Sequence, residues 1–283
     1  MNLTFANRYC QDKTIKSGSS YYYSFMFLPS PKRQAITALY AFCREIDDIV
    51  DTCQEKTVAH QKLLWWSNEL NVIFKNKSHH PIGMALMEAI QNFDLPKILF
   101  DELIQGMSMD IKFQGYQSFE DLKLYCHCVA STVGLLAVRI FGFGHLETLD
   151  YGRNLGLAFQ LTNIIRDTYE DLAIGRFYLP NEELAQFSIT LDDIKYFKNR
   201  DNWNLFINYQ IERARAYYKK AFSHLKHDDR VKQMSGLIMA EIYQTLLNKI
   251  ESEGLHPNKK IRLSPIKKLW IAWRTHRFET KRG

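Results

Sequence analysis

The chain has 283 residues, of which 46% are hydrophobic and 24% are charged, with only 13 Gly and 7 Pro. This composition is sufficient for the core of one large domain or two small ones, and it favours a helical protein. The five cysteines are odd in number and scattered, which argues against a disulfide framework and favours a reduced, cytosolic compartment.

The net charge of +6 is concentrated at the C-terminus. From Lys259 onward the chain carries nine Lys and Arg residues and a single acid, Glu279. The basic balance is therefore a property of a C-terminal tail that begins at about residue 259, and not of the rest of the chain.

The first half of the chain predicts helices and no signal peptide, because the N-terminus has no apolar run behind a basic start. Ser30-Pro31 predicts an N-cap and a first-turn proline for a helix over 33–51. Pro96 opens another segment in which apolar residues follow helical spacing. The longest apolar stretch, 129–140, contains an arginine and is too short to span a bilayer, so we expect a soluble protein.

The second half continues the helical pattern. Two pairs resemble capping boxes at the start of helices, namely Ser118 with Asp121 and Thr190 with Asp193. We find no internal repeat, low-complexity tract or linker. The sequence therefore predicts one all-α domain over 1–283, with roughly eight to ten helices.

Two acidic clusters, about half a chain apart, are the strongest functional signal. Asp47 with Asp51, and Asp167 with Asp171, are i,i+4 pairs, so each pair projects from one helix face. Two carboxylates about 6 Å apart repel by about 0.7 kcal/mol in water and by more when partly desolvated. A bound divalent cation would turn this repulsion into attraction.

Each cluster extends backwards into a polar stripe on an otherwise apolar helix. One stripe has spacings of 0, 4, 7 and 11 residues and the other 0, 3, 7 and 11. Their members are Tyr40, Arg44, Asp47 and Asp51, and Gln160, Asn163, Asp167 and Asp171. For a single acidic pair we would favour a solvated helix face, but two matching stripes with apolar flanks predict that both face inward.

Two such stripes across a bundle cavity would form an oxygen-rich site without His or Cys. Oxygen ligands suit a hard cation, Mg²⁺ with Mn²⁺ as an alternative, completed by water and substrate phosphate. Arg44 and Arg166 add positive charge suited to a diphosphate. Aromatic residues over 21–27 could line a cavity that stabilises a carbocation, although such a run is also typical of core packing.

The chain resembles the squalene/phytoene synthase family, and the matching motifs cover most of its length in the family's order. The motifs are Ala38–Asp51, Tyr125–Gly134, Gln160–Asp171 and Gly175-Arg176-Phe177-Tyr178-Leu179-Pro180. Within the family, the sequences of Ser17–Tyr23 and Ala38–Asp51 are most similar to those of bacterial presqualene diphosphate synthases of hopanoid pathways.

The resemblance implies a single-domain isoprenoid-synthase helical bundle with a central cavity. It also implies that two farnesyl diphosphates are joined head to head, with loss of diphosphate, to give presqualene diphosphate. Metal-binding roles would fall on Asp47, Asp48, Asp51, Asn163, Asp167 and Asp171. Catalytic roles would fall on the four paired aspartates together with Tyr40 and Tyr125. Substrate-binding roles would fall on Ser20, Tyr21, Arg44, Gln160, Asn163, Arg166, Tyr243, Lys260 and Arg262.

One feature departs from the family. Members often carry an arginine near the C-terminal end that reaches a diphosphate, and here its counterpart is ambiguous between Lys260 and Arg262. Lysine would not give the same bidentate contact.

Several alternatives remain at this point. A squalene synthase would continue to squalene with NADPH, which we do not expect as a cofactor, and a phytoene synthase would use geranylgeranyl diphosphate. Asp47-Asp48-Ile49-Val50-Asp51 also spells the DDxxD string of chain-elongating prenyltransferases and terpene cyclases, but the second cluster fits neither.

The basic tail interleaves Trp270, Trp273 and Phe278 with cations, which suits an anionic membrane surface. We therefore predict a cytoplasmic enzyme with peripheral contact at the inner membrane face and no nucleic-acid partner. A disordered solubilising tail and a non-enzymatic helical scaffold are the competing interpretations. The sequence makes no prediction of oligomeric state.

Overall fold

The computed structural model describes residues 2–17, 21–53 and 55–282. Within these ranges the chain forms helices, turns and one isolated bridge, and no strand. The α-helices are α1 (Leu3–Lys16), α2 (Tyr21–Phe25), α3 (Ser30–Thr52), α4 (Lys56–Phe74), α5 (Pro81–Phe93), α6 (Lys97–Ile111), α7 (Phe119–Cys126), α8 (Thr132–Phe141), α9 (Glu147–Arg166), α10 (Thr168–Ala173), α11 (Asn181–Gln186), α12 (Leu191–Lys195), α13 (Arg200–His224), α14 (Met234–Glu253) and α15 (Pro265–Arg282).

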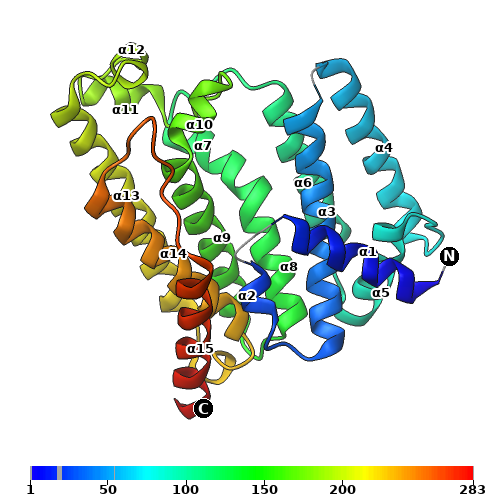
Figure 1. The fold of residues 1–283 in the computed structure, drawn as a ribbon. Helices are drawn as coiled ribbons and strands as arrows, with labels where there is room; N and C mark the ends of the chain where they lie inside the picture. The colour runs from blue at the N-terminus through cyan, green and yellow to red at the C-terminus, as the bar shows by residue number, and fades with distance from the viewer. Residues whose placement is uncertain (1, 18–20, 54, 283) are drawn as a thin grey trace.

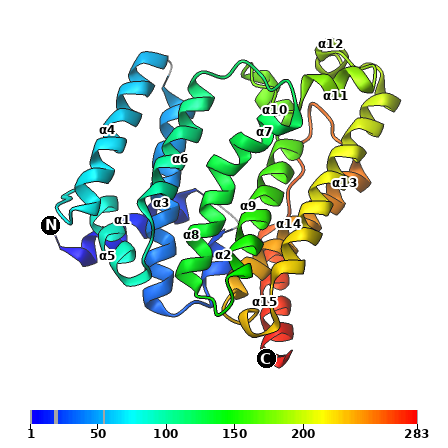
Figure 2. The ribbon, with the colours of Figure 1, turned by 180° about the vertical axis from the view of Figure 1, so that it is seen from behind.

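The long helices form one bundle, as predicted (Figures 1 and 2). Helices α1, α2, α14 and α15 lie on the face seen in Figure 1, and α8, α9 and α13 lie behind them. Helix α9 packs against α8, α13 and α14, while α3 packs against α1, α5 and α6. The core has two parts, one around α9, α13 and α14 and the other around α3 to α6, with α8 contributing to both.

Helix α3 shows why these segments fold as they do. Leu39, Phe42, Ile46 and Ile49 recur every three or four residues and are buried, so one side of the helix enters the core. The predicted N-cap is displaced, because Ser30 lies inside the helix, after Pro29, and makes no capping hydrogen bond. Both predicted capping boxes are present, at Ser118 and at Thr190.

The structure has more helices than the predicted eight to ten, because several segments are broken. The segment expected to run from Thr190 to about residue 226 stops at Lys195 and resumes at Arg200. Phe197 and Asn199, in the intervening turn, have positive φ values of 54° and 47°, which a continuous helix does not permit.

The apolar segment that contains residues 129–140 is part of a longer helical run, Phe119–Phe141, which could span a membrane by length and composition alone. Half of its most apolar window is buried, and it packs against α9 and α6, as a core helix does. A π-helical turn, His127–Ser131, joins α7 to α8. Beyond it, a Cβ on Gly134 would lie 2.1 Å from the Gly152 carbonyl oxygen, so only glycine allows α8 and α9 to cross so closely.

The basic C-terminal segment is not detached from the bundle. From Pro265 to Arg282 it forms α15, which packs against α14 and α2. Ile271 and Ala272 are buried in this contact.

Candidate active site

One cavity brings together most of the residues singled out in the sequence. It opens between α3, α6, α9, α10 and α14 and is closed on one side by the segment 260–268. The predicted site residues that line it are Tyr21, Tyr40, Arg44, Asp47, Asp51, Tyr125, Gln160, Asn163, Arg166, Asp167, Asp171, Tyr243, Lys260 and Arg262. Both acidic pairs therefore face the same space.

The first cluster lies on the unbroken helix α3. Arg44 donates a hydrogen bond of 2.9 Å to Asp47. Burial, followed by the charge of Asp51, raises the pKa of Asp47 to about 7. Because 43% of the Asp47 side chain is still exposed, cavity water offsets part of this cost. The first cluster thus contains a carboxylate whose pKa stays raised by burial and by Asp51 even though Arg44 acts to lower it.

The second cluster lies at a helix break that the stripe pattern did not predict. Helix α9 ends at Arg166, and Asp167 stands between it and α10. The Asp171 amide still donates to the Asp167 carbonyl oxygen at 2.8 Å, so the i,i+4 relation survives the break. The expectation of one continuous stripe is therefore wrong in geometry, although all four of its members line the cavity.

Asp167 is the most strongly paired acid of the site. It accepts hydrogen bonds from Arg166 and lies 3.0 Å from Lys260, which also contacts Glu170 at 3.1 Å. Burial acts to raise the pKa of Asp167, but Arg166 and Lys260 outweigh it and hold the pKa below its usual value. For Asp171, burial and then the charge of Asp167 raise the pKa to about 7.

A fifth aspartate of the cavity, Asp110 on α6, was missed by the sequence analysis. It accepts hydrogen bonds from Tyr125 at 2.7 Å and Tyr178 at 2.9 Å, and it is buried in the cavity wall. Burial raises the pKa of Asp110 to about 6, although both hydroxyls oppose the shift. The available signal was an acid on a predominantly apolar helix, immediately before Ile111.

Arg176 was also missed, although the resemblance included its motif. Its guanidinium donates to the Asp51 carboxylate at 3.0 Å and to the Val50 carbonyl oxygen at 3.2 Å. Arg176 follows α10 in the chain, so it links the loop after the second cluster to the first cluster.

Two predicted residues do not join this group. Asp48 pairs with Lys13 at 3.1 Å and Arg44 at 2.7 Å, and it lines a separate groove between α1 and α3. The structure thus separates Asp48 from the other aspartates, contrary to its expected role as a metal ligand. Ser20 lies outside the described residues.

The polar cavity continues into an apolar one. Tyr21, Tyr40, Gln160 and Asn163 line both cavities, so they form the junction. The rings of Tyr21 and Tyr40 are 5.5 Å apart, and the Tyr40 hydroxyl is 2.9 Å from the Ser17 hydroxyl.

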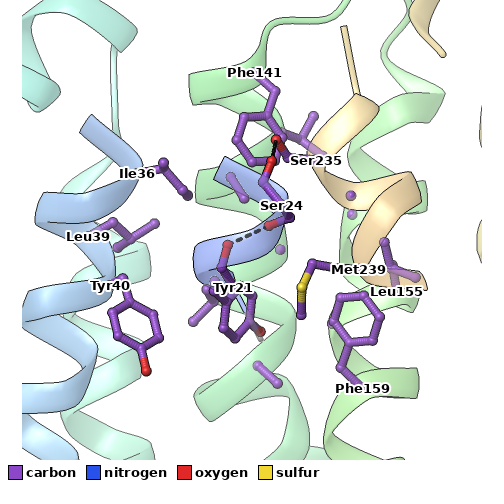
Figure 3. A pocket seen from close by; sticks show the side chains of 18 of the residues that line it. Tyr21, Ser24, Ile36, Leu39, Tyr40, Phe141, Leu155, Phe159, Ser235 and Met239 are labelled. Atoms are coloured by element: carbon purple, nitrogen blue, oxygen red, sulfur yellow. Dashed lines mark hydrogen bonds between the residues drawn. The ribbon is translucent and has the colours of Figure 1, made fainter. Parts of the chain in front are cut away.

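Figure 3 shows the apolar cavity between α3, α2, α8, α9 and α14, with Tyr40 and Phe159 towards one end and Phe141 and Ser235 towards the other. Two serines in its wall hydrogen bond to backbone carbonyls, Ser24 to Tyr21 and Ser235 to Ser24 (Figure 3). Their polar atoms are therefore satisfied within the protein, and the surface offered to a ligand is largely hydrocarbon.

The donor set of the polar end fits a hard divalent cation. The Asn163 Oδ1 atom is buried without a hydrogen-bond partner, an arrangement that is costly unless a ligand completes it. Asp47 and Asp171 line the same cavity, and their pKa values are raised mainly by burial, as is common for carboxylates at functional sites. Among the described residues no three acidic, His or Cys side chains converge tightly enough to hold an ion by themselves. A cation here would need additional oxygens, such as those of a diphosphate.

This arrangement suits an amphiphilic substrate with a polyanionic head and a long apolar tail. The aspartates, arginines and Lys260 surround the position for the head, and the apolar cavity receives the tail. The aromatic rings at the junction could stabilise positive charge that forms where head and tail meet.

Comparison with known proteins identifies relatives whose names agree with a substrate of this kind. The family model for squalene/phytoene synthase matches residues 15–267. The chain is 33% identical to 15-cis-phytoene synthase of Synechococcus elongatus, over 89% of this chain and 86% of the relative. It is also 33% identical to phytoene synthase 2 of Solanum lycopersicum, over 86% and 80%.

Solved structures share the fold over nearly the full length. A dehydrosqualene synthase in complex with a ligand is similar with a TM-score of 0.88 and 25% identity, over 99% of this chain and 98% of the other. Squalene synthase HpnC from Alicyclobacillus acidocaldarius has a TM-score of 0.79 and 28% identity, over 90% and 96%.

Members of this family are prenyltransferases that act on prenyl diphosphates, and they typically use a divalent metal. The two acidic clusters, the cavity that they share and the family match over residues 15–267 lead to the same conclusion. The chain belongs to the squalene/phytoene synthase family.

Proposed function

We propose that this protein is a presqualene diphosphate synthase, which condenses two farnesyl diphosphates head to head. The observation that carries the proposal is the single continuous cavity, with both acidic clusters at one end and hydrocarbon walls at the other. Such a cavity matches a substrate with a charged head and a prenyl tail. Farnesyl specificity, metal dependence and hopanoid or squalene biosynthesis belong to this proposal.

The condensation has three steps. The C–O bond of one farnesyl diphosphate breaks, and its electron pair leaves with the diphosphate. The double bond of the second farnesyl diphosphate attacks the resulting allylic cation, and a C–C bond forms. A proton is then lost as the cyclopropane ring closes, which leaves one diphosphate on the product and one released.

In the first step, this chain's residues would hold and neutralise the leaving group. Arg44 and Arg262 face the cavity and would bind diphosphate oxygens, while Arg166 and Lys260 keep Asp167 ionised. Asp47, Asp51, Asp167, Asp171 and Asn163 would hold Mg²⁺, or Mn²⁺ in its place. When bound, this ion would offset the charge of the departing diphosphate.

The proton lost in the last step needs an acceptor close to the cavity. Tyr125 donates its hydroxyl proton to Asp110, so its oxygen can accept a proton while its own moves to the carboxylate. A pKa of about 6 makes Asp110 a suitable final acceptor near neutral pH. Tyr40 and Tyr21 would present their rings to the cation at the cavity junction.

A second candidate is a phytoene synthase acting on geranylgeranyl diphosphate, which is favoured by the curated relatives of that name. We favour the shorter farnesyl chain because Phe25, Phe141 and Tyr151 line the apolar cavity, and we propose that these bulky rings limit its depth. A third is a squalene synthase that continues with NADPH, and a structural relative carries that name.

Product analysis distinguishes the three. The purified protein is incubated with Mg²⁺ and either farnesyl or geranylgeranyl diphosphate, with and without NADPH. We expect presqualene diphosphate from farnesyl diphosphate and little change on adding NADPH. A C40 product from geranylgeranyl diphosphate would replace the proposal with the second candidate, and rapid NADPH-dependent squalene formation would replace it with the third.

The prenyl product is largely apolar, so the enzyme is expected to work beside a membrane. We include in the proposal a cytoplasmic location with peripheral contact at the inner membrane face, made through the basic C-terminal segment.

A further inference from the structure

Helix α15 has one face committed to the bundle. Ile271, Ala272 and Thr275 are buried, and the ring of His276 stacks on Phe27 with centroids 4.3 Å apart. Glu279, the only acid on the helix, is buried and paired with Arg230 at 2.6 Å. The helix is therefore held in a defined orientation, and its opposite face is fixed in space.

The opposite face carries large apolar residues at the surface. Ile266, Trp270, Trp273 and Arg277 are spaced 0, 4, 7 and 11 residues and form one stripe, which we call the outer stripe. Ile266 is 81% exposed, Trp270 52% and Trp273 50%. No other segment of the described chain presents two exposed tryptophans on one helix face.

Positive charge borders the outer stripe, and one of its cations, Arg274, is paired with Glu241 of α14 at 3.1 Å. The six cations of the helix are Lys267, Lys268, Arg274, Arg277, Lys281 and Arg282. Arg274 and Arg277 lie over the rings of Trp270 and Trp273, with guanidinium carbons 5.0 Å and 5.4 Å from the ring centroids. Glu279, the only acid of α15, is used by Arg230, so the helix itself contributes cationic, apolar and neutral polar side chains but no acid to its exposed side.

We propose that the outer stripe of α15 binds the surface of an anionic lipid bilayer. This proposal rests on the proposed function and deepens it by assigning the membrane contact to one helix face and one lipid chemistry. Tryptophan is favoured at the level of the headgroups, and flanking Lys and Arg residues are attracted by anionic headgroups. A helix that is apolar on its outer face and basic at its borders lies in the interface plane.

This contact would place the membrane beside the catalytic cavity. Pro265, at the start of α15, and Lys268, one turn later, line the same cavity as the aspartates. The surface bound to lipid and the wall of the cavity are therefore parts of the same helix. An apolar product would leave close to the bilayer that receives it.

The test is flotation of the full-length protein with vesicles of phosphatidylcholine alone or mixed in equal parts with phosphatidylglycerol. We expect binding to the mixed vesicles, much weaker binding to the neutral ones, and weakening by salt. The tryptophan emission should shift to shorter wavelength on binding, because Trp270 and Trp273 leave water.

Two variants address the two components of the surface. Trp270→Ala with Trp273→Ala should weaken partitioning by about tenfold or more and remove most of the emission shift. Arg277→Gln with Lys281→Gln should weaken it by about thirtyfold, since each basic residue near an anionic surface contributes about 1 kcal/mol.

Matched controls come from α4 and the turn that follows it, on the other side of the bundle from α14 and α15 (Figures 1 and 2). Leu64→Ala with Trp65→Ala removes two side chains that are 54% and 49% exposed, and Lys75→Gln with Lys77→Gln removes two charges. Both control variants should bind vesicles as the unaltered protein does.

Two results would overturn the proposal: wild-type partitioning in the tryptophan variant, or binding to single-stranded RNA by a protein that ignores both kinds of vesicle. Diphosphate release from detergent-dispersed farnesyl diphosphate is measured in parallel. It should be unchanged in both α15 variants, because neither alters a residue that lines the cavity. Vesicle binding by a protein that releases no diphosphate would support the membrane contact and contradict the proposed function.

Discussion

The two acidic clusters have similar spacing in the sequence but different surroundings in the fold. The first lies on the unbroken helix α3, and its partner Arg176 comes from the loop after the second cluster. The second lies at the junction of α9 and α10, and Asp167 is paired with both Arg166 and Lys260. In the first cluster both carboxylates have a cation partner, Arg44 for Asp47 and Arg176 for Asp51, whereas in the second cluster the ion pairs are made by Asp167. In each cluster one acid, Asp47 or Asp171, nevertheless keeps a raised pKa, mainly because it is buried.

The largest expected effect separates acids that share the cavity from one that does not. Asp47→Asn and Asp171→Asn should each lower diphosphate release from farnesyl diphosphate by about a thousandfold or more, because each removes a ligand oxygen charge from the leaving-group site. Asp48→Asn is the matched control. Its side chain lies outside the cavity and reaches it only through its exposed ion pair with Arg44, so activity should stay within about tenfold. Equal losses at positions 47 and 48 would contradict this division.

A smaller loss of activity is expected when the hydrogen bond between Tyr125 and Asp110 is removed. Tyr125→Phe removes the hydroxyl bonded to Asp110, and turnover should fall by about a hundredfold, the usual contribution of a positioned proton acceptor. Tyr116→Phe is the control, since its ring stacks on Tyr125 with centroids 5.5 Å apart, whereas the hydroxyls that hydrogen bond to Asp110 among the described residues belong to Tyr125 and Tyr178. Pre-steady-state product analysis should show that diphosphate release precedes the slowed step in the Tyr125 variant.

The ambiguity between Lys260 and Arg262 can be decided by their different surroundings. Lys260 already contacts Asp167 and Glu170, whereas the Arg262 side chain is exposed and faces the cavity. Arg262→Gln should therefore raise KM for farnesyl diphosphate by about tenfold, the effect of losing a hydrogen bond to a charged group. Lys260→Gln should raise KM less. The reverse order would identify Lys260 as the diphosphate contact.

The smallest effect is on the stability of the metal-free protein. Asp47 and Asp171 have folded-state pKa values of about 7, above the usual value of 3.8. The folded protein therefore binds more protons than the unfolded chain between about pH 4 and 7, so stability falls as pH rises through this window and levels off above it. With chelator present, Tm at pH 5.5 should exceed Tm at pH 8 by about 2–4 °C. Asp47→Asn should reduce the difference, and an unchanged slope would contradict the assigned pKa.

The sequence predicted the helical class and most of the cavity, because the 3.6-residue period alone places Asp47, Asp51, Gln160 and Asn163 on inward stripes. The family was predicted from the resemblance of its motifs. The stripe left out Asp48, which was assigned to the metal only through the family resemblance, and the structure directs Asp48 towards Lys13 on α1. The helix break at Asp167 could not be predicted, because no proline or glycine lies next to it in the sequence.

Asp110 was missed for a different reason. Its partners Tyr125 and Tyr178 lie 15 and 68 residues away in the chain, so the hydrogen bonds that define its role exist only in the folded protein. Local patterns report which face of a helix is polar, and contacts across the bundle decide which polar residue meets which.

The π-helical turn at His127–Ser131 has a consequence for how the cavity is divided. An extra residue in a helix rotates everything beyond it by about 100° relative to what precedes it. Tyr125, before the turn, points to Asp110 at the polar end, while Val133 and Ala137, after it, line the apolar cavity. Deleting a single residue within 127–131 would restore a regular helix and put these two sets out of phase. One added residue thus allows a single helical segment to contribute side chains to both the polar and the apolar cavity.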